Sequence, residues 1–393
     1  MKQSSTIKSK QNDLSREPMN SLPKNWKWKY LHELGSFSKG KGILKEQVIE
    51  SGLPCVRYGE IYTTHNFILK KFKSFISEDV ATESKKIKSG DILFAGSGET
   101  LEEIGKAVAY VGNEKAYAGG DVIILSTNEN VNTEWLSYVL ETGIVRRQKR
   151  RLGQGHSIVH IYPSDLATLI VPYPPELEQE SISSMLDLID ISISKINSLI
   201  EKKELQKQWF RQMLLTGKKR LKGFSDEWKK IELELALSYE QPTKYLTNNF
   251  NGYSHSTPVL TANKSFILGY TDDTKGIYTE HPVIIFDDFT TATQFVDFPF
   301  KAKSSAMKIL VAKKGENLSY IYEAMRLIKF EIGGHGRHWI SQFTFMNIPY
   351  PCIEEQKKIS NYLSNIDIKI ESVNKQITQI QTFKKGLLQQ MFV

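Results

Sequence analysis

The sequence predicts an α+β fold in which two β-rich globular blocks are separated by two long helices that form an antiparallel coiled coil. The first observation is an internal repeat: residues 172–200 recur at 349–377, displaced by 349 − 172 = 177 positions, and 14 of the 29 aligned pairs are identical. The second is an echo ahead of each copy, where Trp26 and Trp228 each open a Lys-rich stretch. A repeat of this length indicates two copies of one structural unit, related by a pseudo-twofold axis.

Each copy of the repeat starts with a proline box and continues as a long amphipathic segment. Prolines keep the entering chain extended, so a helix is expected to begin behind the box. Steps of three and four between apolar residues mark the seam of a coiled coil, and in the first copy this seam contains Ile182, Leu186, Ile189, Ile193, Ile196 and Ile200. About 40 helical residues would form a rod of roughly 60 Å. An ordinary helical bundle is the alternative, but two matching seams in one chain favour pairing with each other.

The blocks between the helices carry strand and turn signals. The predicted organisation is a disordered tail, a first block, a box with the central helix, a second block, and a box with the C-terminal helix, at residues 1–20, 21–171, 172–222, 223–348 and 349–393. Apolar runs between Gly-rich turns predict strands near residues 53–59, 91–95, 107–111 and 121–125, and in the second block near 257–261, 281–286 and 306–311. Helices are expected near 133–141 and 318–328.

Composition narrows the class of protein. The chain has no apolar run approaching the ~18 residues of a membrane span, and its Lys/Ser/Gln/Asn-rich start has no apolar core of a signal peptide. Cys55 and Cys352 are too few for a disulfide framework or a cysteine-based zinc site. We therefore expect a cytoplasmic protein without membrane contact. The net charge of +8 favours a polyanionic partner, although a ribosomal or membrane-surface role would also fit this charge.

The proline boxes and their surroundings follow one pattern. The box runs Pro172-Tyr-Pro-Pro-Glu-Leu-Glu-Gln-Glu-Ser-Ile182, with a lead-in from His160 to Leu166 and an opening Leu-Pro-Lys-Asn-Trp that ends at Trp26. This pattern resembles the domain junctions in specificity subunits of type I restriction–modification enzymes, over nearly the whole chain beyond the tail. The second copy departs from it at Cys352 and Ile353, and its lead-in lacks the aspartate.

The resemblance implies a non-catalytic chain, present once per complex, that reads an asymmetric bipartite site in double-stranded DNA. The two blocks are then target-recognition domains, and the partners are two methyltransferase subunits and the restriction subunits. No cofactor is expected in this chain, whereas S-adenosylmethionine, ATP and magnesium are expected in the partner subunits. The candidate partner-binding residues are helix positions shared by both repeats: Gln179, Ile182, Leu186, Gln356, Ile359 and Leu363.

Motifs that would make the chain an enzyme are incomplete. The stretch 35–42 is one residue short of a P-loop and has Gly where Ser or Thr should bind magnesium, and 96–98 is a lone Gly-x-Gly. Asp287 and Asp288 follow an apolar strand without a Glu-x-Lys partner, and His335 and His338 lack the further ligands of a zinc site. A standalone endonuclease or fused restriction–methylation enzyme remains the alternative, as does a coiled-coil adaptor without DNA specificity.

Candidate DNA contacts lie at matching places in the two blocks. Lys and Arg contact phosphates, while Arg, Gln and acidic side chains read base edges. The densest cationic cluster, 146–151, precedes a Gly-Gln-Gly-His turn, and the second block has a Gly/His/Arg loop at 333–338. A solvated helix face is the competing interpretation of the cluster. The candidates are Arg147, Lys149, Arg150, Arg151, Gln154 and His156 in the first block and His335, Arg337 and His338 in the second, with the strand-end loops Ser97, Glu99, Thr100, Thr290 and Thr291 as further candidates.

The direction of helix pairing follows from where each block enters its helix. Each block precedes the N-terminus of its own helix, so parallel pairing would bring both blocks to one end. Antiparallel pairing places them at opposite ends, where equivalent faces can address opposite strands of one duplex, as symmetric dimers address palindromes. We expect the helix length to set the spacer between two different half-sites.

Overall fold

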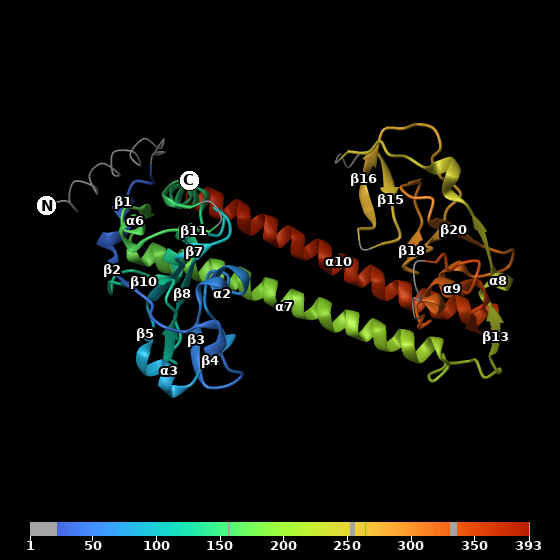
Figure 1. Ribbon diagram of the computed structural model, residues 1–393, viewed down its shortest axis with the longest axis horizontal. Helices are drawn as coiled ribbons and strands as arrows, with labels where there is room; N and C mark the ends of the chain where they lie inside the picture. The colour runs from blue at the N-terminus through green and yellow to red at the C-terminus, as the bar shows by residue number, and fades with distance from the viewer. Residues whose placement is uncertain (1–21, 156–157, 252–255, 264, 331–335, 393) are drawn as a thin grey trace. The chain divides into compact units, whose positions relative to one another are not determined.

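The computed structural model describes residues 22–155, 158–251, 256–263, 265–330 and 336–392. It divides into two compact units: module 1, from Met1–Lys195 with Ile377–Val393, and module 2, Ile196–Gln376. Each module therefore combines one globular block with a part of each long helix (Figure 1).

The two long helices are α7 (Glu176–Leu215, 40 residues) and α10 (Ile353–Met391, 39 residues). Gly217, just after α7, has a φ of +69°, the left-handed conformation with which a glycine commonly ends a helix. In module 1 Lys384 near the end of α10 bonds Asp190 in the first half of α7, and in module 2 Lys207 of α7 bonds Asp367 of α10. The start of α7 and the end of α10 share the core of module 1, and the end of α7 and the start of α10 share the core of module 2, so the helices run antiparallel, as predicted.

Module 1 is built on an antiparallel sheet with the strand order β2-β10-β6-β8. A second sheet has the order β4-β3-β9-β5, and two smaller ladders are β1-β12 and β7-β11. The strands are β1 (Lys27–Tyr30), β2 (Gly35–Lys39), β3 (Leu53–Val56), β4 (Ser74–Ile76), β5 (Lys85–Ile87), β6 (Asp91–Ala95), β7 (Ser97–Gly98), β8 (Ala107–Tyr110), β9 (Ala116–Ala118), β10 (Val122–Thr127), β11 (Val159–His160) and β12 (Ile170–Tyr173). The helices are α2 (Tyr58–Thr63), α3 (Glu78–Glu83), α4 (Thr133–Leu140), α5 (Gly143–Leu152) and α6 (Pro163–Leu166).

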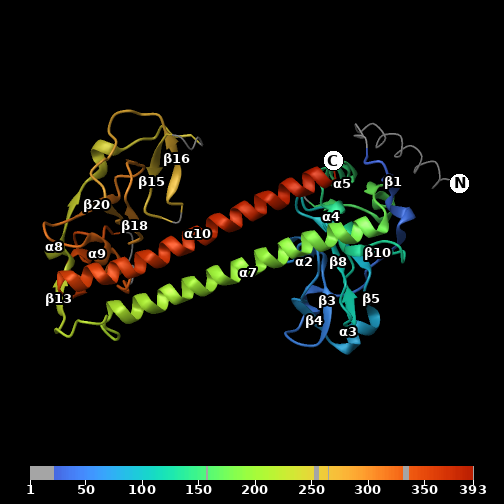
Figure 2. The ribbon, with the colours of Figure 1, turned by 180° about the vertical axis from the view of Figure 1, so that it is seen from behind.

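The central strand β6 is buried on both faces because neighbouring side chains point to opposite sides of a sheet. Ile92 and Phe94 enter the core that contains α4, α5 and the start of α7, whereas Leu93 and Ala95 enter the core toward the second sheet. Phe392, the last described residue of the chain, belongs to the first of these cores. Figure 2 shows α4 and α5 close to this end of α10.

Module 2 is also built on a four-stranded sheet with a smaller sheet beside it, but its strands differ in order and number. Its main sheet has the order β14-β20-β17-β18, a smaller one has β16-β15-β19, and β13 pairs with β21 as β1 pairs with β12. The strands are β13 (Lys229–Glu232), β14 (Leu237–Glu240), β15 (Thr257–Leu260), β16 (Ile267–Thr271), β17 (Val283–Asp287), β18 (Thr293–Val296), β19 (Lys301–Ala302), β20 (Met307–Ala312) and β21 (Asn347–Tyr350), with the helices α8 (Leu233–Ala236) and α9 (Leu318–Met325).

Most predicted elements are confirmed by strands or helices at the expected places, and the α+β class with two repeated β-rich units holds. Helix α5, which contains the cationic cluster, and short edge strands such as β7 and β11 were not among the predicted elements. None of the helices that the structure describes has the length and apolar content needed to cross a membrane.

Candidate nucleic-acid interface

Helix α5 carries the cationic cluster of module 1 and is strongly two-faced. Ile144, Val145 and Leu152 are buried in the core. The opposite face is exposed and carries four guanidinium groups, those of Arg146, Arg147, Arg150 and Arg151. Arg150 also lies 3.0 Å from Glu102 Oε1, a pair in which both side chains are more than half exposed, so it contributes little to stability. The helix thus presents a dense positive face while its apolar face anchors it.

Lys149 does not belong to that face, and its assignment as a DNA contact is wrong. Its side chain is 2% exposed. The ammonium group donates to the carbonyl of Gly105 at 2.8 Å and to Glu141 Oε1 at 2.7 Å. Burial lowers the pKa of Lys149, while the neighbouring Glu141 carboxylate acts in the opposite direction. Lys149 therefore ties α5 to the end of α4 and to the loop before β8.

The Gly-Gln-Gly turn after α5 is closed by backbone hydrogen bonds. Gln154 and His160 exchange N–H···O bonds of 2.9 and 2.7 Å, and the side chain of Gln154 is exposed. Gly155 has a φ of +121°, and a Cβ there would lie 2.1 Å from the carbonyl oxygen of Ile158, so only glycine fits. His156 lies outside the described residues.

The strand-end loop after β6 lies against this turn. Ser97 and Gly98 of β7 pair with His160 and Val159 of β11, and the hydroxyl of Ser97 is 2.9 Å from His160 Nδ1. Ser97 is 2% exposed, so the expectation that it contacts DNA is wrong: it holds the turn in place. The structure therefore brings together two segments that the sequence analysis proposed separately.

Two candidates in that loop do reach the surface. Glu99 and Thr100 are exposed, and their backbone N–H groups donate to Glu103 Oε2 at 3.1 and 3.2 Å. Apolar residues around the same loops were not predicted, because exposed aliphatic and aromatic residues carry no sequence signal: Leu101 is 41%, Ile158 54% and Tyr162 48% exposed. Charged, polar and apolar side chains thus share this surface of module 1.

Module 2 has an equivalent junction made from different residues. Asp288, after β17, accepts from the N–H of Trp339 at 2.8 Å through Oδ1, and its carbonyl accepts from the N–H of His338 at 2.9 Å. Its Oδ2 lies 3.0 Å from the ammonium of Lys308, with both side chains 1% exposed. His338 is itself 2% exposed, so its assignment as a DNA contact is wrong. Arg337 is exposed, and His335 lies outside the described residues.

The loop between β17 and β18 presents Thr290 beside that junction. Asp287 Oδ1 accepts from the Thr290 N–H at 2.8 Å and from its hydroxyl at 3.0 Å. Thr291 has a φ of +56°, in the left-handed region that few non-glycine residues adopt. Thr290 is exposed and Thr291 half-buried. Among the described residues, no group of three His, Cys, Asp or Glu is placed to hold a metal ion.

The six helix residues proposed to bind partners are buried inside the chain itself, so this prediction is wrong. Their side chains pack each long helix onto its own globular block. The exposed fractions are 0% for Gln179, 4% for Ile182, 0% for Leu186, 0% for Gln356, 1% for Ile359 and 0% for Leu363. Gln179 shows the pattern: its amide donates to the carbonyl of Pro174 at 3.0 Å and accepts from the N–H of Asn132 at 2.9 Å. These positions are identical in the two repeats because each long helix packs on its own globular block in the same way.

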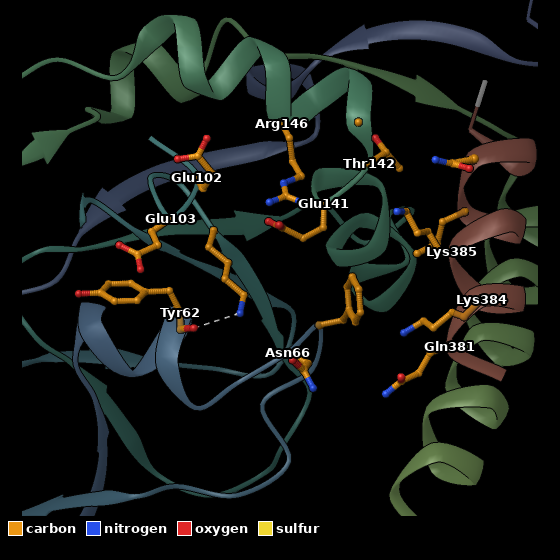
Figure 3. Close-up of a pocket in the computed structure, with 15 residues that line it drawn as sticks. Tyr62, Asn66, Glu102, Glu103, Glu141, Thr142, Arg146, Gln381, Lys384 and Lys385 are labelled. Atoms are coloured by element: carbon orange, nitrogen blue, oxygen red, sulfur yellow. Dashed lines mark hydrogen bonds between the residues drawn. The ribbon is translucent and has the colours of Figure 1, made fainter. Parts of the chain in front are cut away.

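A charged cluster, which we call the helix joint, links both long helices to the block in module 1. Asp190 of α7 accepts from Lys384 of α10 at 2.6 Å and from the hydroxyl of Tyr138 of α4 at 2.8 Å. The Lys384 ammonium also lies 3.9 Å from the centroid of the Phe67 ring. Burial lowers the pKa of Lys384, an effect that Asp190 opposes. Beside the joint is a cavity of about 620 Å³ into which Glu141, Arg146 and Lys385 also project (Figure 3).

The helix joint of module 2 is ionic throughout. Lys207 of α7 lies 2.5 Å from Asp367 of α10 and 3.6 Å from Glu323 of α9. Arg211 donates to Glu323 at 2.6 Å. A cavity of about 530 Å³ adjoins this joint, as in module 1.

Comparison with known proteins agrees with this architecture. The family model described as "Type I restriction modification DNA specificity domain" matches twice, at residues 23–207 and 225–382. The specificity subunit of the Escherichia coli EcoR124I/EcoR124II enzymes is 46% identical over 147 residues, which cover 36% of each chain. A putative MjaX specificity subunit of Methanocaldococcus jannaschii is 24% identical, over 96% of this chain and 95% of its own.

Solved structures share the fold. The S subunit of a type I restriction-modification system from M. genitalium superposes with a TM-score of 0.66 at 16% identity, covering 95% of this chain and 98% of that one. A chain from a structural study of complex assembly and conformational transition of the type I R-M system superposes with a TM-score of 0.56 at 14% identity, covering 95% and 99%.

Proposed function

Because the chain belongs to the type I restriction–modification specificity-subunit family, we propose that each module reads one half of a bipartite DNA site. The observation that carries the proposal is the same construction in both modules. In each module, the loop at the end of the central strand (β6 or β17) is hydrogen-bonded to a turn that lies shortly before the proline box. In module 1 the exposed candidates on these segments are the α5 arginines, Gln154, Glu99 and Thr100.

The chemistry of this surface suits a duplex. Arginines on an exposed helix face can neutralise phosphates and release counterions, and an exposed Gln can pair with the edge of adenine. In module 2, Arg337 and Thr290 are the exposed candidates that the structure describes. Because the two surfaces differ in composition, the half-sites they read should differ, giving an asymmetric site with an unread spacer.

We further propose that the chain neither methylates nor cuts DNA by itself, and that partner methyltransferase and restriction subunits join it. Support comes from the family and from the incomplete catalytic motifs in the sequence. Since the six shared helix residues first proposed for this role are buried against the chain's own blocks, the partner-binding surface must use other residues of the helices. A partner-free chain that methylates or cleaves a duplex would instead favour the standalone-enzyme alternative.

The test is DNA binding by the purified chain with its methyltransferase subunits, using a random duplex library followed by sequencing of the bound fraction. We expect enrichment of two different short motifs at a fixed separation. The salt dependence should be steep, with a slope in log K against log salt of about −0.9 per phosphate contact. Tight binding without any enriched motif would support the adaptor alternative and reject sequence recognition.

A further inference from the structure

The internal repeat places two ion pairs at equivalent positions of the helix pair, one in each module. In module 1 Lys384 Nζ lies 2.6 Å from Asp190, and in module 2 Lys207 Nζ lies 2.5 Å from both oxygens of Asp367. The lysines are separated by 384 − 207 = 177 positions, the same displacement that relates the aspartates, 367 − 190 = 177. Each pair therefore joins the acid of one helix to the lysine of the other.

Both pairs are compatible with a single register of the helices. From Asp190 to Lys207 along α7 is 207 − 190 = 17 residues, and from Lys384 back to Asp367 along α10 is 384 − 367 = 17 residues. In an antiparallel pair, equal advances along one helix and retreats along the other keep positions opposite each other. One register thus satisfies the two ion pairs at once.

We propose that these two ion pairs are the register-determining contacts of the helix pair and thereby fix the spacer between the half-sites. The second clause rests on the proposed function, whereas the first concerns the protein alone. Buried polar residues in coiled-coil seams are best attested as devices that select one register. Lys207 and Lys384 are 9% and 7% exposed, so their charges are withdrawn from water and depend on their partners.

The apolar seam alone selects the register weakly, because its pattern recurs about every seven residues. A slip of one heptad would place Asp367 opposite Ile200 and Asp190 opposite Ile377. A slip in the other direction would place Asp367 opposite Leu214 and Asp190 opposite Met391, so each aspartate would again meet an apolar side chain. The Asp190 and Asp367 side chains are 25% and 50% exposed, so the cost of a slip falls mainly on Lys207 and Lys384, whose buried ammonium groups would lose their carboxylate partners. The two buried lysines therefore disfavour the slipped registers, which the apolar seam alone would tolerate.

Each pair also touches its globular block, so a slip would disturb more than the helices. Tyr138 of α4 donates to Asp190, and Glu323 of α9 lies 3.6 Å from Lys207. The blocks are thereby tied to one position along the helix pair. A change of register would have to break a contact with the block as well as the ion pair.

The first experiment reads the register directly. Replacing both pairs with apolar residues of similar size (Asp190→Leu, Lys384→Met, Lys207→Met, Asp367→Leu) should leave the chain folded, because such replacements are often neutral or stabilising. Spin labels are placed at Ser192 and Thr382, two exposed positions of module 1, in a Cys352→Ser background. We expect one distance peak in the parent and further populations in the variant, with the helices translated by about 10 Å per heptad.

A matched control keeps the ion pairs and removes an exposed pair within α10. Glu371 and Lys375 are 2.7 Å apart and their side chains are 64% and 73% exposed, so Glu371→Leu with Lys375→Met should leave the single distance peak unchanged. A single, parent-like peak in the apolar variant would overturn the proposal.

The second experiment measures spacer preference with the assembled complex, on duplexes in which the distance between the half-sites varies. The apolar variant should accept additional spacers differing by about three base pairs, since one heptad of helix matches that length of duplex. Mixed registers with an unchanged spacer would overturn the link to the spacer. Absence of any site preference in the parent complex would reject the proposed function, while the label distances still decide the register.

Discussion

The helix joints of the two modules occupy equivalent positions but are filled differently. Tyr138 and Glu323 each lie six residues after the asparagine that caps their helix, Asn132 for α4 and Asn317 for α9. Arg211 of module 2 corresponds to Leu388 in module 1, 388 − 211 = 177 positions later. Module 1 therefore completes its joint with a hydroxyl and aromatic rings, whereas module 2 uses a network of charges.

The repeat preserves the ion pair between the two helices and not the contact that the globular block makes with it. The Lys–Asp pair between the helices is present twice, but the contact from the block changes from a tyrosine to a glutamate with an added arginine. A buried polar group needs a partner, and either solution supplies one. The same holds at the interface, where Ser97 with His160 and Asp288 with Trp339 fix equivalent turns by different bonds.

The largest expected effect is a loss of stability in module 1 alone. Lys149→Met removes the ammonium that satisfies Glu141 and should lower the free energy of unfolding of module 1 by about 3–5 kcal/mol, the usual result of unpairing a buried charge. Hydrogen exchange of α4 and α5 peptides measures it, with module 2 peptides as the internal reference. Unchanged protection in α5 together with a reduced salt slope of DNA binding would restore Lys149 as a phosphate contact.

A second variant pair uses the repeat as its own control. Glu355 is 1% exposed and accepts from Arg220 at 2.8 and 2.7 Å and from Trp228 Nε1 at 2.9 Å, whereas its repeat equivalent, Glu178, is exposed. Glu355→Gln should destabilise module 2 by about 2 kcal/mol, because bonds to charged groups contribute roughly 1.5–3 kcal/mol each. Glu178→Gln should change module 1 by less than about 0.5 kcal/mol. Equal effects in urea unfolding would contradict the assignment.

A smaller effect distinguishes the modules by pH. Burial lowers the pKa of His65 in module 1, Lys106 and Lys73 add to that effect, and Glu60 opposes it. Above about pH 6.5, the usual pKa of histidine, the ring is neutral in both states. Below it the unfolded chain binds the proton first, so the stability of module 1 should fall by at most about 1.4 kcal/mol per pH unit, down to the folded-state pKa.

His65→Phe should flatten this dependence between about pH 5 and 6.5. His32→Phe, at an exposed position, is the matched control and should leave the pH dependence of module 1 as it is. A parent-like slope in the His65 variant would assign the pH dependence to other groups.

Much of the fold was accessible from the sequence because apolar periodicity encodes it directly. The buried strand β6 is an apolar run after its first residue, Asp91, and the two long helices repeat a seam that few other structures could satisfy. The burial of Lys149 also had a signal: it lies four residues after Val145 and three before Leu152, on the same helix face as both. The dense arginines around it concealed that periodicity.

The remaining errors have one physical cause. Identity between Gln179 and Gln356 was interpreted as a shared partner surface, but two copies of one packing solution produce identity equally well. Likewise, Ser97 and His338 are polar residues in loops, and only the tertiary structure shows that their neighbours enclose them. Sequence patterns located the loops correctly, whereas the direction of each side chain depends on distant strands.

The central claim is that the two modules read separate half-sites, and mapping methylated sites in cells tests it most directly. The parent chain and a variant carrying Arg150→Ala with Gln154→Ala would each be expressed with the methyltransferase subunits, and the modified positions sequenced. Loss of a base contact costs about 1–3 kcal/mol at the position it reads. We predict that one half of the bipartite motif becomes degenerate while the other half and the spacer stay the same. Degeneracy in both halves, or an unchanged motif with binding retained, would contradict the account.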